Sequence, residues 1–175
     1  MTQKGRWAMN QLGLEEALDI AMEAELKAQA FYAQAALEVQ DRRGRDLLGR
    51  LAAFEQHHYQ KLSELAAALQ RDGQFIDYEM QTMAAFVPLV AAGETAGTML
   101  DELPDQVAVL TRAIENEKAA EERYVVLAES TADPAGRAMF ENLAAEERLH
   151  RRILEDEFFS LSNKGSWAWS GLYGE

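Results

Sequence analysis

The chain has 175 residues, of which 30 are Asp or Glu and 17 are Lys or Arg, so its formal net charge is −13. We therefore expect it to bind neither nucleic acid nor an anionic membrane, because their phosphates would repel it. It contains no cysteine, which excludes disulfides, cysteine-bound zinc, iron–sulfur clusters and a thiol nucleophile. No apolar run is long enough to span a membrane, and the first residues lack a secretory signal, so we expect a cytoplasmic protein.

Four segments carry the spacing of apolar residues that is typical of one face of a helix. They cover residues 14–40, 45–71, about 104–130 and 134–160. Asp41 to Gly44 is predicted to form the turn between the first two helices. Asp133 and Pro134 are typical of an N-cap followed by a first-turn proline, and they predict the start of the fourth helix.

The connections between these segments predict the topology. The loops within each helix pair are short, whereas residues 73–103 form one long crossover, in which residues 80–92 are predicted to include a short helix. This pattern predicts an all-α, ferritin-like four-helix bundle over residues 14–160, built from two helical hairpins. Residues 161–175 form a tail with Trp167 and Trp169, which are expected to be covered because exposed tryptophans are rarely left free. The tail could dock on its own bundle, on a second subunit or on a partner, and we expect docking within a homo-oligomer.

The two hairpins are an internal repeat. A shift of 92 positions (117 − 25) places the first pair of helices on the second without a gap. The repeat retains polar residues on faces that are otherwise apolar: one Glu in each of the first and third helices and a Glu-x-x-His motif in each of the other two. These residues are Glu25, Glu117, Glu55, His58, Glu147 and His150.

Four buried carboxylates need compensating charge, since burial without it costs many kcal/mol or forces protonation. No Lys or Arg lies on the same stripes to provide it. Two divalent cations would balance four carboxylates, with the two imidazoles completing their coordination. Oxygen-rich ligands together with imidazole suit iron or manganese.

Further polar residues lie close to these motifs. Tyr32 and Tyr124 follow Glu25 and Glu117 by two helical turns on the same face. They are predicted to be hydroxyl donors that orient the ligating carboxylates, and the alternative is a core tyrosine bonded to any nearby acceptor. His57 is predicted to be a surface residue or a neighbour of the site. The carboxylate of Glu157 is expected to be solvated at the end of the bundle.

The motifs Glu25-x6-Tyr32, Glu55-x-x-His58, Glu117-x6-Tyr124 and Glu147-x-x-His150 resemble those of rubrerythrin-like members of the ferritin-like dinuclear carboxylate superfamily, over residues 14–160. The resemblance implies two iron ions per chain, with manganese as the alternative, and an enzyme that reduces hydrogen peroxide or O2. Such rubrerythrins have a seventh carboxylate three residues after the ligand in the third helix. Ala120 stands there in this chain, so either the following residue, Glu121, is the extra ligand or this ligand is absent.

The resemblance also implies partners. Typical rubrerythrins carry a rubredoxin domain with four cysteines, and this chain has none. We therefore expect a separate protein to donate electrons, and a homo-oligomer of at least two subunits.

Other functions remain open at this stage. One is iron oxidation and storage of the ferritin or bacterioferritin type, although bacterioferritins place a haem-binding Met where this chain has Gln56, so no haem is expected. A second is a manganese catalase-like dismutase, which needs no electron donor. A third is a metal-stabilised scaffold that recruits a partner.

Overall fold

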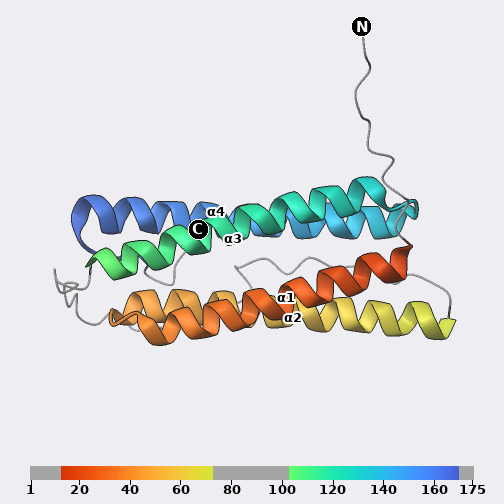
Figure 1. Ribbon diagram of the computed structural model, residues 1–175, viewed down its shortest axis with the longest axis horizontal. Helices are drawn as coiled ribbons and strands as arrows, with labels where there is room; N and C mark the ends of the chain where they lie inside the picture. The colour runs from red at the N-terminus through yellow and green to blue at the C-terminus, as the bar shows by residue number, and fades with distance from the viewer. Residues whose placement is uncertain (1–12, 73–102, 170–175) are drawn as a thin grey trace, which may run out of the picture.

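The computed structural model describes residues 13–72 and 103–169, and its regular elements are four helices (Figure 1). They are α1 (Leu14–Glu38), α2 (Arg42–Asp72), α3 (Leu103–Ser130) and α4 (Pro134–Lys164). Helix α1 packs along α2 and helix α3 along α4, and the two hairpins lie side by side. The prediction of an all-α bundle of two helical hairpins is confirmed. The predicted short helix at 80–92 lies outside the described residues.

The two short connections differ in how closely they follow the prediction. Asp133 caps α4 as predicted, because its Oδ1 accepts a hydrogen bond of 2.8 Å from the backbone N–H of Gly136. Helix α2 begins earlier than predicted, since the side chain of Asp41 accepts the backbone N–H of Arg43 at 2.8 Å and so caps the helix. Gly44 therefore lies inside the first turn of α2 and not in a loop.

Helix α4 is longer than the predicted end near Ser160. It continues to Lys164 and ends at Gly165, whose φ of 67° lies in the left-handed region that favours glycine. The chain then turns back, so that the following tryptophans reach the bundle.

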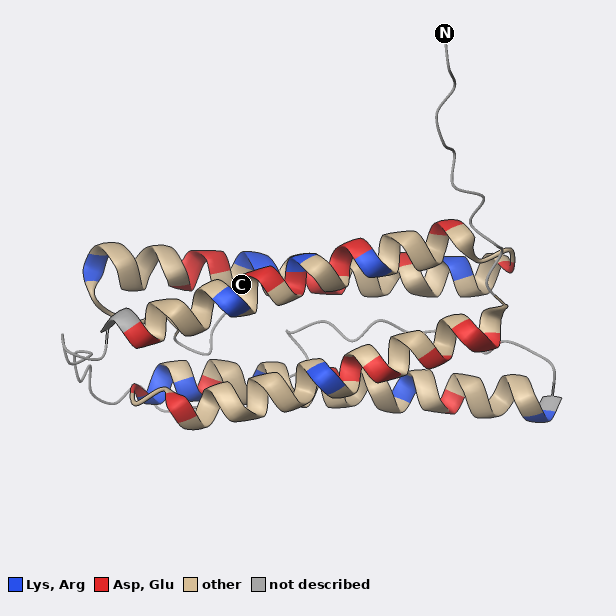
Figure 2. Ribbon diagram, viewed as in Figure 1, with Lys and Arg blue, Asp and Glu red and all other residues tan. Residues whose placement is uncertain are grey.

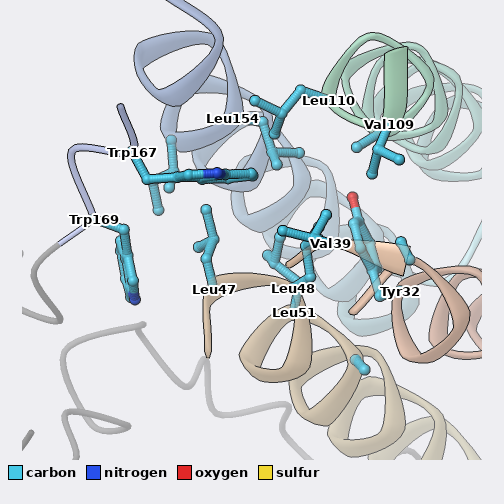
Figure 3. Close-up of a cluster of buried hydrophobic side chains, with 14 of the residues drawn as sticks. Tyr32, Val39, Leu47, Leu48, Leu51, Val109, Leu110, Leu154, Trp167 and Trp169 are labelled. Atoms are coloured by element: carbon cyan, nitrogen blue, oxygen red, sulfur yellow. The ribbon is translucent and has the colours of Figure 1, made fainter. Parts of the chain in front are cut away.

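The apolar core forms two clusters that lie on either side of a layer of buried polar residues. The first cluster contains Val39, Leu47, Leu48, Leu51, Leu110, Leu154, Trp167 and others (Figure 3). The second contains Leu18, Leu62, Leu65, Leu127, Phe140, Leu143 and others. The polar layer between them is therefore shielded from water along the bundle axis.

The start of the C-terminal tail packs on its own bundle, which is one of the three docking modes that the sequence leaves open. Trp167 is 1% exposed, and its Nε1–H donates a hydrogen bond of 2.6 Å to Oε1 of Gln106. Trp169 donates from Nε1 to Oδ2 of Asp46 at 2.8 Å. Figure 3 shows Trp167 beside Leu47 and Leu154, where it closes one end of the first cluster.

Glu157 supports this docked segment. The prediction that it is solvated is wrong, because its side chain is fully buried and its Oε2 accepts the backbone N–H of Ala168 at 2.8 Å. Burial raises the pKa of Glu157 above its usual range, although the hydrogen bond from Ala168 acts in the opposite direction.

Acidic and basic residues are distributed over all four helices (Figure 2). Within residues 13–72 and 103–169, no helix carries an apolar stretch that could cross a membrane.

Candidate metal centre

All four helices contribute to the polar layer at the middle of the bundle. Helices α1 and α3 each provide one glutamate, and helices α2 and α4 each provide a glutamate and a histidine three residues apart. This spacing is close to one helical turn, so both side chains of each motif lie on the same face. All six side chains are at most 2% exposed: Glu25, Glu55, His58, Glu117, Glu147 and His150. The structure thus brings together all six residues that the sequence predicts as metal ligands.

These residues form two overlapping groups of potential ligands. The first consists of Glu25, Glu55, His58 and Glu147, and the second of Glu55, Glu117, Glu147 and His150. Within each group, one ligand atom per residue lies within 4.8 Å of all the others. Glu55 and Glu147 belong to both groups, which is the arrangement expected of carboxylates that bridge two ions.

Both imidazoles direct Nδ1 towards the carboxylates. Nδ1 of His58 lies 3.4 Å from Oε2 of Glu25 and 3.4 Å from Oε2 of Glu55. Nδ1 of His150 lies 3.0 Å from Oε2 of Glu147 and 3.5 Å from Oε1 of Glu55. The two rings are stacked with their centroids 5.8 Å apart. The pseudo-two-fold relation of the sequence repeat is therefore also present in the geometry of the site.

The four glutamates form two pairs, one with a raised pKa and one with a lowered pKa. Burial, reinforced by the charge of Glu55, raises the pKa of Glu25 well above its usual range. Burial and the charge of Glu147 do the same to the pKa of Glu117. Burial also opposes ionisation of Glu55 and Glu147, but the nearby imidazoles of His150 and His58 outweigh it and lower the pKa of both.

Burial alone would lower the pKa of both histidines, yet the surrounding carboxylates raise it well above the usual range. For His58 these carboxylates are led by Glu146, and for His150 by Glu147. Without a bound cation, burial and repulsion thus favour protons on Glu25 and Glu117, and the surrounding carboxylates favour protons on the imidazoles. A bound metal ion would displace them, because metal ligands must be deprotonated.

Each glutamate that belongs to a single group accepts a hydrogen bond from a tyrosine of the opposite hairpin. Tyr32 of α1 donates to Oε1 of Glu117 in α3, and Tyr124 of α3 donates to Oε1 of Glu25 in α1. Both hydroxyls thus contact the carboxylates, as the sequence predicts. Burial, followed by the charge of Glu117, raises the pKa of Tyr32 well above its usual range, so the phenol remains a donor.

Glu121, the candidate extra ligand, lies outside both groups in this structure. Its Oε1 accepts a hydrogen bond of 2.7 Å from Nε of Arg148, and its Oε2 lies 3.2 Å from Nη2 of Arg151. These arginines outweigh the effect of burial and lower the pKa of Glu121. His57 is half-buried and also lies outside both groups, in agreement with its prediction as a neighbour of the site.

Glu146 is the residue that the sequence analysis missed. It precedes the motif residue Glu147 and is only 5% exposed, and its Oε2 lies 2.6 Å from Nε2 of His58. The two atoms lie within ion-pair distance, and neither has a hydrogen bond among the described residues. One signal in the sequence could have indicated it. The residue before the motif glutamate is acidic in the second half of the repeat, whereas the equivalent residue in the first half is Phe54.

Comparison with known families decides what kind of centre this is. The model of the rubrerythrin family matches residues 1–66 and 108–165, a range that includes all six predicted ligands. The chain belongs to the rubrerythrin family. The matched range leaves out residues 67–107 and 166–175, so the resemblance seen in the four motifs extends over most of the chain.

A solved structure supports the fold. A hypothetical protein from Pyrococcus furiosus is similar, with a TM-score of 0.65 and 24% sequence identity, over 90% of this chain and 95% of that chain. Comparison with curated proteins gives no match.

Membership of the rubrerythrin family implies a di-iron carboxylate centre, and the residues present fit such a centre. Four carboxylates and two imidazoles are the donor set that iron and manganese accept. Oε2 of Glu25, Oε1 of Glu55 and Nδ1 of His58 are buried ligand atoms without a hydrogen bond among the described residues. Buried polar atoms are normally satisfied, so these three are best explained as ligands of a cation.

Proposed function

We propose that this chain is a non-haem di-iron oxidoreductase that reduces hydrogen peroxide to water with electrons from a separate donor protein. The observation that supports the proposal is the buried layer in which Glu55 and Glu147 are shared by two ligand groups. Bound Fe(II) would supply the two electrons that cleavage of the O–O bond requires. Each peroxide takes up two electrons and two protons and leaves as two molecules of water.

The protein's own residues hold and insulate the centre. The hydroxyls of Tyr32 and Tyr124 fix the carboxylates of Glu117 and Glu25 from across the bundle. The apolar clusters on both sides exclude water, which strengthens the electrostatic interactions inside the layer. Because the sequence contains no cysteine, it cannot form the four-cysteine rubredoxin centre, and the electrons would come from a separate protein.

The first test is a count of iron ions followed by a turnover assay. The purified protein is loaded anaerobically with Fe(II), desalted, and assayed for iron and for consumption of hydrogen peroxide in the presence of a chemical reductant. We expect about two iron ions per chain and peroxide consumption that depends on the reductant. The variant Glu25→Ala/Glu117→Ala should lose both, whereas Glu122→Ala, at an exposed position of α3, should retain both.

Other results would support a different function. Many more iron ions per chain after aerobic loading, together with a large assembly in size-exclusion chromatography, would favour iron storage. Evolution of O2 from peroxide without reductant by the manganese-loaded protein would favour catalase-like dismutation. Two bound ions that react with neither peroxide nor O2 would contradict the proposed activity.

A further inference from the structure

The two halves of the metal centre differ at one buried position. The residue directly before the motif glutamate is Phe54 in α2 and Glu146 in α4, and the 92-residue shift places these two residues on one another (146 − 54). Both are buried, with exposed fractions of 1% and 5%. The ligands and the tyrosines, by contrast, are identical in the two halves. This position therefore breaks the symmetry of an otherwise duplicated centre.

Glu146 contacts the outer nitrogen of one histidine only. Its Oε2 lies 2.6 Å from Nε2 of His58, on the side of the ring opposite to the Nδ1 that faces the ligand group. Neither carboxylate oxygen of Glu146 has a hydrogen bond among the described residues, although both are buried. An unsatisfied buried carboxylate is costly unless a partner compensates it, and the imidazole of His58 is the group in contact.

The corresponding place beside His150 is occupied by a phenyl ring. The ring centroids of Phe54 and His150 are 5.3 Å apart at an interplanar angle of 63°. A phenyl edge packs well against an imidazole, but it cannot accept a hydrogen bond from N–H as a carboxylate does. His58 therefore faces a charged acceptor, whereas Phe54 offers His150 apolar packing only.

This difference has a consequence for metal binding. If Nδ1 of His58 coordinated an ion, the ring proton would be on Nε2 and could be donated to Glu146, which would fix the orientation of the ring and increase its basicity. Outer carboxylates of this kind typically change metal affinity by about ten- to a hundredfold. We infer that Glu146 makes the site formed by Glu25, Glu55, His58 and Glu147 the tighter of the two, so that divalent ions load in a fixed order. The inference rests on the proposed metal centre and goes beyond the proposed reaction.

The test is a titration of the metal-free protein with Co(II). Binding is measured by calorimetry and by the visible absorption of bound Co(II). We expect two binding steps with affinities that differ by about ten- to a hundredfold. Glu146→Gln retains the shape of the side chain and removes its charge. It should weaken the first step by a similar factor and leave the second within about twofold.

Two sets of controls locate the effect. Phe54→Leu changes the neighbour of His150 without adding or removing an acceptor, so it should leave the first step within about twofold of the wild-type value. His150→Ala should retain the tight step, whereas His58→Ala should lose it. If Glu146→Gln does not show the wild-type circular dichroism spectrum and melting temperature, that variant is not informative. The two histidine variants then show which site binds Co(II) more tightly.

Equal affinities in the wild-type protein would overturn the inference, as would a tight step that survives in His58→Ala and is lost in His150→Ala. Equal weakening of both steps by Glu146→Gln would also overturn it. These results differ from failure of the proposed function. Absence of Co(II) binding would contradict the metal centre itself, whereas two ordered binding steps without peroxide turnover would contradict only the proposed reaction.

Discussion

Tyr32 donates a hydrogen bond to the carboxylate of Glu117, which lies 85 residues further along the chain and in the opposite hairpin. Its counterpart in the repeat, Tyr124, donates to Glu25. Each tyrosine therefore connects the two hairpins and holds a glutamate that belongs to only one of the two ligand groups. The shared glutamates, Glu55 and Glu147, contact the histidines instead.

This crossed arrangement predicts that each tyrosine affects one site. Tyr32→Phe should weaken Co(II) binding at the site that contains Glu117 by about tenfold or more, because the carboxylate loses the donor that orients it. Tyr124→Phe should act on the site that contains Glu25. Titration calorimetry of both variants checks the prediction. Tyr59→Phe, at a half-buried position in α2 outside both ligand groups, is the control, and an equal effect of all three variants would contradict the prediction.

The raised pKa values predict that the metal-free protein becomes less stable as pH rises. The pKa of His58 and of His150 lies well above 6.5 in the folded chain, so above that pH the folded state binds more protons than the unfolded state. The free energy of unfolding then falls with increasing pH. Glu25 and Glu117 act in the same direction between pH 4.5 and their own raised pKa values.

The experiment measures the melting temperature of metal-free protein between about pH 7 and about pH 9, above the pKa of an unfolded histidine. We expect a decrease over this range and a smaller one in His58→Gln/His150→Gln. His57 acts in the opposite direction, because burial and His58 lower its pKa from 6.5, and its effect is confined to the acid end of this range and below. The pKa values of Glu55 and Glu147 are lowered from 4.5, so these two residues change the pH dependence of stability only in acidic solution. A melting temperature that rises over this range would contradict the assignment.

The contact between Gly44 and Trp167 predicts opposite effects for two glycines of the same helix. A Cβ atom on Gly44 would lie 2.5 Å from Cε2 of Trp167 and 2.7 Å from Cγ1 of Val39, so Gly44→Ala forces the docked tail or the core to move. We expect a loss of about 1–3 kcal/mol in the free energy of unfolding. Gly49→Ala meets no atom within 4 Å and should instead stabilise α2 by up to about 1 kcal/mol. Urea denaturation of both variants tests this, and similar changes in both would contradict the close contact.

The position of Glu121 predicts that this residue is dispensable for metal binding. Its carboxylate pairs with Arg148 and Arg151 at the edge of the bundle. Glu121→Ala should therefore bind as many Co(II) ions per chain as the wild-type protein, with unchanged visible absorption, while its stability falls by less than about 1 kcal/mol. Loss of one ion per chain, or a shifted absorption band, would show that Glu121 moves into the site when metal binds.

The sequence alone determined the composition of the centre. The helical period fixes which side chains share a face, so the three-residue spacing of Glu55 and His58 places both towards the core in any helix that buries this stripe. The repeat then requires Glu147 and His150 to do the same. Only the tertiary structure decided the features that depend on packing between helices. Glu146 lies beside Glu147 in sequence, about a quarter of a turn around the helix, and its burial depends on where α2 brings His58. Likewise, the sequence around Gly44 is typical of a turn, yet Gly44 lies within a helix because Asp41 caps α2. A side chain at Gly44 would overlap the ring of Trp167, which lies far away in the sequence.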